Sequence, residues 1–238
     1  NGRALNAQKE LPLLLHNLQP NEKNDFQKIL LTQLLLEHPT CDAEVILDFE
    51  ICACDTQPAA VIGFKNEYIA GARLDNLLSC FAGLRALLDS DGLQPTLLIC
   101  TDHEEVGSES AAGAGGSFVS DVISRLATSA GLDGEDQRRM LARSFFISAD
   151  MAHGWHPNFP AAYEPCHHAT VNAGPVIKSN ANQRYSTNAD TAARFMAICA
   201  KAGVPCQQYA HRTDLGCGST IGPIVASRLG IPSVDVGS

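Results

Sequence analysis

The sequence predicts an α/β fold with a largely parallel sheet flanked by helices, and two observations carry this prediction. After about residue 60, short apolar segments alternate with longer amphipathic ones, which is typical of strands that alternate with helices. Hydrophobic residues make up 45% of the 238 residues, so the chain can bury a substantial core. Because the pattern before residue 60 is different, we expect a small segment over residues 1–60 and an α/β core over residues 61–238.

The first segment is expected to contain one helix and one strand. Residues 25–37 predict a helix, which Pro39 ends. Residues 44–54 alternate in polarity and are rich in β-branched side chains, as in a strand. Turn-forming residues at 56–58 separate that strand from another short segment at 61–64. The apolar stripe of the helix consists of Phe26, Ile29, Leu30, Leu34 and Leu35.

In the core, predicted helices and strands follow one another along the chain. Asn188 is placed to cap the third helix, whose inner face would carry Ala192, Phe195, Met196 and Cys199. The expected helices cover residues 76–88, 117–130, 187–202 and 219–229, and the expected strands cover residues 96–100, 145–148 and 231–236.

Charge and composition narrow the class of function. A net charge of −9 argues against partners that select for clustered Lys and Arg, so neither nucleic acid nor an anionic membrane is expected. No apolar run approaches the ~20 residues that cross a bilayer. The nine cysteines have no repeated spacing and no signal peptide precedes them, which predicts free thiols in a cytoplasmic protein.

Acidic residues occur where an α/β fold places its ligands. Glu104 and Glu105 follow the strand predicted at 96–100, and Asp150 follows the strand predicted at 145–148, with His153 three residues on. Such positions face the crevice beyond the carboxyl ends of strands. Asp75 immediately precedes a predicted helix. Taken singly, Glu104 and Glu105 could instead be a solvated surface pair, Asp150 could form an Asx turn, and Asp75 could cap a helix.

Together the acids predict a hydrolytic metal site. Two adjacent carboxylates point in different directions, so one can bind a metal while the other accepts a proton from the attacking water. Carboxylates and histidines suit zinc, and a shared carboxylate can hold two ions together. A Mg²⁺ or Mn²⁺ phosphoesterase remains an alternative, although the glycine-rich residues 113–116 and 216–222 lack the Gly-Lys-Ser/Thr ending of a P-loop.

Longer motifs surround these positions in a fixed order along nearly the whole chain. They are Asp55-Thr56-Gln57-Pro58, Arg73-Leu74-Asp75-Asn76, Asp102-His103-Glu104-Glu105-Val106-Gly107-Ser108, Ser148-Ala149-Asp150-Met151-Ala152-His153, Gly174-Pro175-Val176-Ile177-Lys178, Asn180-Ala181-Asn182-Gln183-Arg184-Tyr185 and Gly216-Cys217-Gly218-Ser219-Thr220-Ile221-Gly222-Pro223. This set resembles the aspartyl aminopeptidase family and the related vacuolar aminopeptidases.

The resemblance implies removal of an N-terminal, often acidic, residue from peptides by a site with two zinc ions per subunit. It implies that Asp75 bridges the metals, that Glu105 and Asp150 each bind one, and that Glu104 is the general base. The resemblance also implies three substrate contacts, namely His153, Lys178 and Tyr185. A non-catalytic assembly subunit of the same fold is the remaining alternative, against which the intact Glu104 argues.

The same resemblance implies a zinc-exopeptidase α/β domain with an inserted β-rich dimerisation domain, whose end would be residues 1–60, and assembly into a homo-oligomer, a dodecamer. The family's metal-binding histidines, and one that reaches a neighbouring active site, lie outside the matching positions. We therefore expect a fragment that binds zinc weakly alone. Five histidines of this chain lack the sequence context of the family's metal ligands and do not replace them: His16, His38, His167, His168 and His211.

Overall fold

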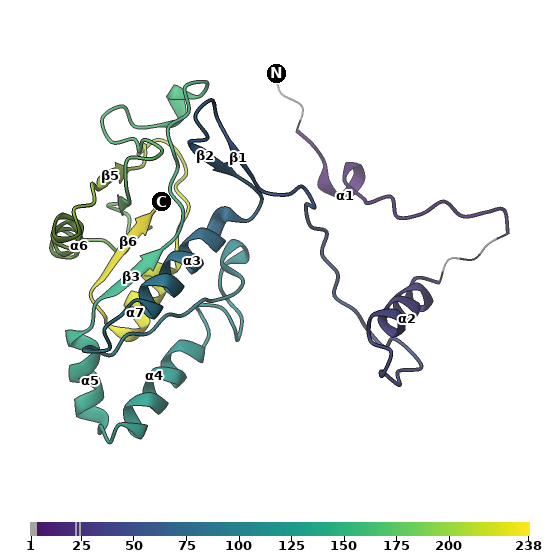
Figure 1. Cartoon of the computed structure of the whole chain (residues 1–238), viewed down its shortest axis with the longest axis horizontal. Helices are drawn as coiled ribbons and strands as arrows, with labels where there is room; N and C mark the ends of the chain where they lie inside the picture. The colour runs from purple at the N-terminus through teal and green to yellow at the C-terminus, as the bar shows by residue number, and fades with distance from the viewer. Residues whose placement is uncertain (1–3, 22, 24) are drawn as a thin grey trace. The chain divides into compact units, whose positions relative to one another are not determined.

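The computed structural model describes residues 4–21, 23 and 25–238, and its contacts divide the chain into two compact units (Figure 1). The first is Asn1–Thr56 and the second is Gln57–Ser238. The assignment of the first unit to an inserted dimerisation domain stays a prediction. Across the described ranges, no helix is long and apolar enough to span a membrane.

The first unit contains helices α1 (Ala7–Glu10) and α2 (Phe26–Glu37). The predicted helix at 25–37 is confirmed, since Asp25 caps α2 by accepting from the Lys28 amide at 3.1 Å. The apolar stripe of this helix is not covered, because no described residue of α2 is buried. The strand predicted at 44–54 is also wrong, since these residues belong to no strand. A ladder needs a partner, and none pairs with them in the described part of the chain.

The second unit contains nearly all the regular structure, and every predicted core helix is present with its ends shifted by a few residues. Its elements are β1 (Ala60–Ile62), β2 (Tyr68–Ala70), α3 (Leu74–Leu88), α4 (Phe118–Ser129), α5 (Gly134–Arg143), β3 (Phe146–Ala149), β4 (Val176–Ser179), α6 (Ala189–Ala202), β5 (Gln207–Ala210), α7 (Ile221–Leu229) and β6 (Ser233–Gly237), with 3₁₀ turns at Glu104–Val106 and Pro160–Ala162.

Four strands form the central sheet, in the spatial order β3-β6-β4-β5. β3 runs parallel to β6 and β4 runs parallel to β5, whereas β4 and β6 are antiparallel. A mixed, mostly parallel sheet was expected and is confirmed. The strand predicted at 96–100 is wrong, because this apolar segment pairs with no strand of the described residues.

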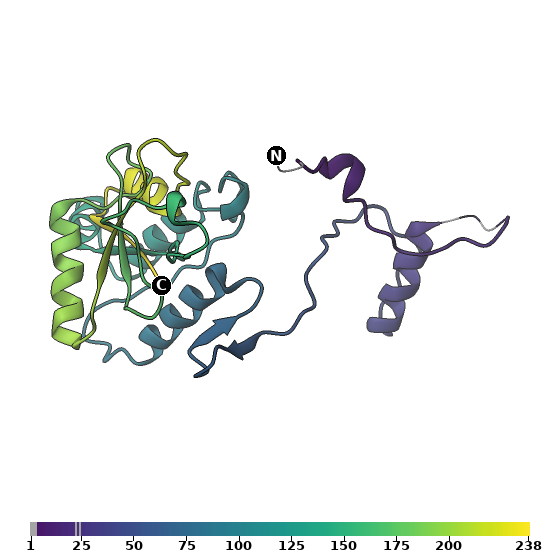
Figure 2. The same ribbon diagram turned by 90° about the horizontal axis from the view of Figure 1, so that it is seen from above.

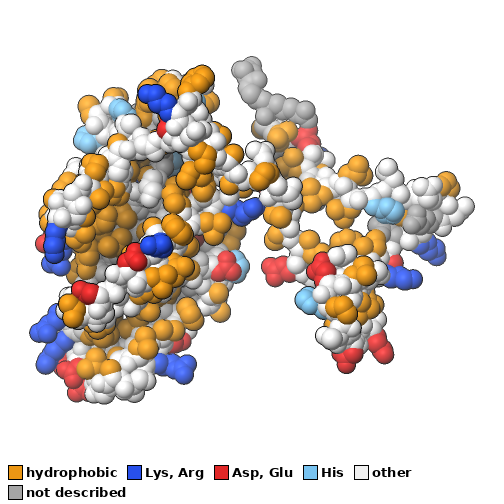
Figure 3. Space-filling view, in the orientation of Figure 1, with side chains coloured by type: hydrophobic (Ala, Val, Ile, Leu, Met, Phe, Trp, Pro, Cys, Tyr) orange, Lys and Arg blue, Asp and Glu red, His pale blue; other side chains and the backbone are white. Residues whose placement is uncertain are grey.

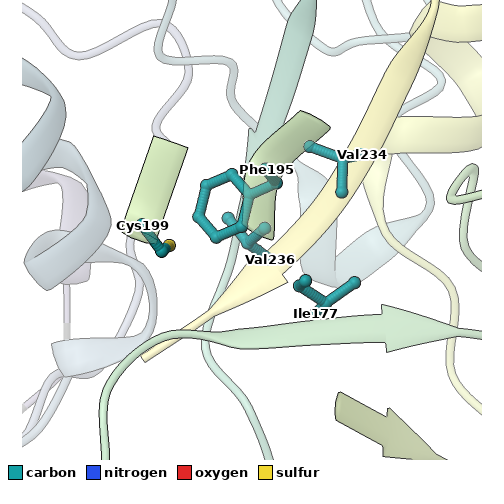
Figure 4. Close-up of a cluster of buried hydrophobic side chains, with 5 residues drawn as sticks. All are labelled: Ile177, Phe195, Cys199, Val234 and Val236. Carbon is teal, nitrogen blue, oxygen red and sulfur yellow. The ribbon is translucent and has the colours of Figure 1, made fainter. Parts of the chain in front are cut away.

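β6 presents different chemistry to its two sides. Val234 and Val236 pack with Phe195 and Cys199 of α6 and with Ile177 of β4 (Figure 4). Alternate residues of a strand point to opposite faces, so Asp235 faces away from α6. Figure 2 shows α6 as a long helix along one flank of the sheet. The predicted inner face of this helix is therefore confirmed, since Ala192 and Met196 also pack against the cluster.

Asp235 is fully buried on the other side of β6 and links three segments. Its carboxylate accepts hydrogen bonds from the amide and the hydroxyl of Ser186, at 2.6 and 2.7 Å, and from the Thr220 hydroxyl at 2.5 Å. Thr220 caps α7, and a Cβ on Gly222 would lie 2.2 Å from the Asp235 Oδ2. Only glycine lets α7 approach β6 this closely.

One apolar stripe of the second unit stays exposed. α3 carries large hydrophobic side chains at helical spacing, and each is at least 47% exposed: Leu77, Phe81, Leu84 and Leu88. Figure 3 shows hydrophobic side chains spread over the visible surface of this unit. The helical periodicity that predicted α3 therefore marks a face that the described residues leave uncovered.

Candidate functional site

The start of α3 places Asp75 beside the end of β3. Asp75 and Asn76 depart from helical geometry, and the peptide bond between them is cis. The Asn76 Nδ2 donates to the carbonyl of Ala149 at 2.7 Å. Ala149 is the last residue of β3, so this bond brings Asp75 next to Asp150.

A folded loop holds the two adjacent glutamates. Glu104 and Glu105 begin a 3₁₀ turn that follows His103, which has a left-handed backbone with φ 61°. The His103 Nδ1 contacts the Ser110 hydroxyl at 2.8 Å, and Asp102 forms an isolated β-bridge with Gly113. The loop thus closes on itself although the preceding segment forms no strand.

Asp150 is tied to both the sheet and Lys178. Its amide donates to the carbonyl of Val236 at 3.0 Å, which extends the pairing of β3 with β6 by one residue. Lys178 of β4, which is only 2% exposed, donates from Nζ to the Asp150 Oδ2 at 3.2 Å and to the Met151 carbonyl at 3.0 Å. A buried ammonium needs such partners, so Lys178 is a counter-ion of the site.

Electrostatic interactions show that the four acids form one cluster. Burial raises the pKa of Asp75 from 3.8 to about 6, assisted by a hydrogen bond with Asp150 and by the charges of Asp150, Glu105 and Glu104. The pKa of Glu104 is also raised, by burial and then by the charges of Asp150 and Glu105, whereas Lys178 lowers it. Crowded like charges make a cation favourable at this point.

The three predicted substrate contacts differ in exposure. Tyr185 is 4% exposed, its ring lies 5.3 Å from the Lys178 Nζ, and Cys217 approaches its hydroxyl at 3.6 Å. His153 is exposed. Loss of solvation and then the charges of His211 and Lys178 lower its pKa. All three residues therefore border the acid cluster directly or through Lys178.

The acid cluster supplies only part of the ligands that a zinc site needs. Among the described residues, no group of three or more His, Cys, Asp and Glu side chains surrounds a single point. If Asp75 bridged two ions, with Glu105 on one and Asp150 on the other, each ion would have two carboxylate ligands from these residues. Zinc usually has four ligands, so this donor set is partial.

Two features of the site were not predicted from the sequence. Asn76 orients the start of α3, and Tyr209 with His211 forms a wall beside His153, with ring centroids 6.2 and 6.4 Å from the His153 ring. The strand β5 that carries Tyr209 was not predicted, because Gln207 and Gln208 interrupt its apolar pattern. The sequence carries no signal for this wall, because it follows from the pairing of β5 with β4, which aligns Tyr209 with Lys178.

Curated relatives match nearly the whole chain. A probable M18 family aminopeptidase 2 from Pseudomonas syringae pv. syringae is 51% identical over 236 residues, which is 99% of this chain and 54% of the relative. The protein with the same description from Azotobacter vinelandii has the same identity and coverage. The chain therefore spans about half the length of the curated relatives it matches.

Solved structures share the fold. A structure described as the complex of Ape4 and Nbr1 has a TM-score of 0.81 at 33% identity, and the match covers 93% of this chain and 44% of that one. A dodecamer of mApe1 from S. cerevisiae has a TM-score of 0.66 at 28% identity, over 77% of this chain and 42% of that one.

The family model described as aminopeptidase I zinc metalloprotease (M18) matches residues 4–238. It confirms the resemblance that the sequence motifs indicated. By this match over nearly its full length, the chain belongs to the M18 family of zinc metalloproteases.

Proposed function

We propose that the protein is an aminopeptidase that removes an acidic N-terminal residue from peptides with the help of two zinc ions. The observation that carries the proposal is the acid cluster, in which three separate segments bring Asp75, Glu104, Glu105 and Asp150 into electrostatic contact. Bound zinc would supply Lewis-acid polarisation of the scissile carbonyl. Asp75 would bridge the ions, with Glu105 and Asp150 as the separate ligands.

Glu104 is the candidate proton acceptor. Its raised pKa moves the carboxyl toward the range in which it can accept a proton from water and return it to the leaving amine near neutral pH. Lys178 faces Glu104 closely enough to lower that pKa, so the two groups oppose each other in setting it. Burial has the larger effect.

The substitution Glu104→Gln tests this role in the longest chain that carries the sequence. We expect metal content to be retained and turnover of an aspartyl anilide to fall by about 100-fold or more, because the ligands stay and the proton acceptor is lost. The matched control is Glu109→Gln, an exposed glutamate of the same loop. Full activity in Glu104→Gln would remove the assignment.

Two alternatives are separated by the same preparations. A non-catalytic assembly subunit would contain no zinc and turn over no anilide, whereas the enzyme would hold two zinc ions per chain. A phosphoesterase would hydrolyse a phosphomonoester in place of the aminoacyl anilide.

The preference for acidic residues is assigned to Lys178, with His153 and Tyr185 as further contacts. Lys178→Ala should raise KM for aspartyl and glutamyl anilides more than for alanyl anilide, because only the acidic side chains need a cation. An equal rise for both would remove the specificity role while leaving the peptidase reading intact.

We also propose that residues 1–238 are not active by themselves and that the protein forms a homo-oligomer. Because the carboxylates of the cluster make only part of a zinc ligand set, residues 1–238 alone are expected to be inactive on aspartyl anilide; activity of these residues alone would refute this. The solved S. cerevisiae mApe1 is described as a dodecamer, which supports a dodecamer here. Analytical ultracentrifugation measures it. The nine free thiols support the expected cytoplasmic location.

A further inference from the structure

The residues after β5 hold a histidine ring in a fixed orientation. The Tyr209 hydroxyl lies 2.6 Å from the His211 Nδ1, and Tyr209 is itself 3% exposed within a buried cluster. The neighbouring Arg212 donates to the Ala161 carbonyl and pairs with Asp214, with 2.9 Å between Nε and Oδ1. The side chains of His211 and of its neighbour Arg212 are therefore both held by hydrogen bonds.

The hydrogen bond defines which ring nitrogen carries the proton. Burial raises the pKa of Tyr209 to about 12, so its phenol keeps its hydrogen at neutral pH. Either direction fits the distance, depending on the tautomer; we assign the one in which the phenol donates to the His211 Nδ1, because a phenol is a better donor than acceptor. In the neutral ring the hydrogen then resides on Nε2, and in the charged ring Nε2 also carries one.

The Nε2 of His211 is a buried donor without an acceptor. It is shielded from solvent and has no hydrogen-bond partner among the described residues. Buried polar groups are nearly always paired, so an unpaired one in a native fold calls for a ligand or ordered water. The Asn76 Oδ1 and the Ser148 hydroxyl are also unpaired, but they belong to the acid cluster's scaffold rather than to its basic side.

The surroundings indicate the charge of the missing acceptor. The His153 ring stacks at an angle on the rings of Tyr209 and His211, and it remains exposed. Lys178 pairs with Asp150, and His153 lies close enough to both His211 and Lys178 for their charges to act on it. The three basic side chains together favour a negatively charged group.

We propose that His211 is a specificity-determining residue of this site, whose Nε2–H donates a hydrogen bond to the side-chain carboxylate of the substrate's N-terminal residue, beside His153 and Lys178. This inference rests on the proposed aminopeptidase function. A neutral N-terminal residue offers no oxygen there, so the buried donor would stay unpaired in that complex.

The first test compares His211→Leu with His211→Gln, because glutamine keeps a donor near the position of Nε2. A hydrogen bond to a charged group implies a fall of about 10-fold or more in kcat/KM for aspartyl anilide in His211→Leu, with less than about a twofold change for alanyl anilide. His211→Gln should recover most of the loss. An equal loss on both substrates, or no recovery in His211→Gln, would overturn the proposal. The control is His167→Ala, an exposed loop histidine that contacts Glu164.

A binding measurement separates this proposal from the peptidase reading. Titration calorimetry with free L-aspartate and L-alanine needs no turnover. We expect His211→Leu to weaken L-aspartate by about 10-fold and L-alanine by less than about twofold. Unchanged L-aspartate binding would overturn the role of His211 even if wild-type turnover is normal. Loss of anilide turnover with selective L-aspartate binding intact would instead count against the peptidase function alone.

Discussion

Removing the charge of Asp75 should stabilise the metal-free protein at neutral pH. Its pKa rises from 3.8 to about 6, chiefly through burial and the neighbouring Asp150. A rise of this size corresponds to at most about 3 kcal/mol. The loss of solvation at Asp75 is only partial, since the residue stays exposed, and solvent screening therefore reduces the expected effect to ~1 kcal/mol. Asp75→Asn should raise the free energy of unfolding by that amount.

The effect has a defined pH dependence. Between pH 3.8 and about 6 the native state binds more protons than the unfolded state, so stability falls as pH rises through this range and the loss is complete above it. The advantage of Asp75→Asn should therefore be ~1 kcal/mol at about pH 7.5 and about a third of that at about pH 4.5.

Urea unfolding in a chelating buffer measures both values. Trp155 is the only tryptophan and lies in the second unit, so its fluorescence reports on the fold that holds the site. In the longest chain that carries the sequence, added zinc should reverse the order, because ionised Asp75 binds metal and asparagine does so poorly. The same advantage at both pH values, or zinc stabilising both proteins equally, would refute the electrostatic reasoning.

Three further predictions concern the packing that supports the site, and urea unfolding measures each. Lys178→Met should cost ~3 kcal/mol because Asp150 and the Met151 carbonyl lose a buried donor, whereas Lys201→Met at the exposed end of α6 should cost little. Gly222→Ala should cost about 2–4 kcal/mol, since its Cβ would lie 2.2 Å from the Asp235 carboxylate, whereas Gly134→Ala, with nothing within 4 Å, should be neutral or stabilising. Phe195→Ala should cost about 3–5 kcal/mol and the half-exposed Phe118→Ala much less; equal costs would contradict the assigned core.

Most helices were predictable from the sequence because periodicity and caps are local properties, whereas α5 was not expected. Asp25 and Asn188 stand where their helices begin, and each accepts a hydrogen bond from the first turn. Strands were less predictable because pairing depends on distant segments. Residues 44–54 and 96–100 have strand-like patterns without a paired neighbour, whereas β5 pairs well in spite of its two glutamines.

The acids of the site were predictable, but their environment was not. Asp150 and the pair Glu104 and Glu105 each follow a short apolar segment, which the sequence shows directly. The hydrogen bond from Asn76 to Ala149 joins residues 73 positions apart, and the burial of Lys178 follows from the sheet. Lys178 would pass for a surface residue after a strand until β4 is seen between β6 and β5.

Asp235 limits how this part of the molecule can vary. The Asp235 carboxylate accepts hydrogen bonds from Ser186, which follows Tyr185, and from Thr220, which caps α7. It also leaves no room for a side chain at Gly222. A change at Ser186, Thr220 or Asp235 alone leaves a partner in this network unpaired, and a side chain at Gly222 would clash with the carboxylate. The position of Tyr185 is therefore coupled, through Ser186 and Asp235, to the packing of α7 against β6.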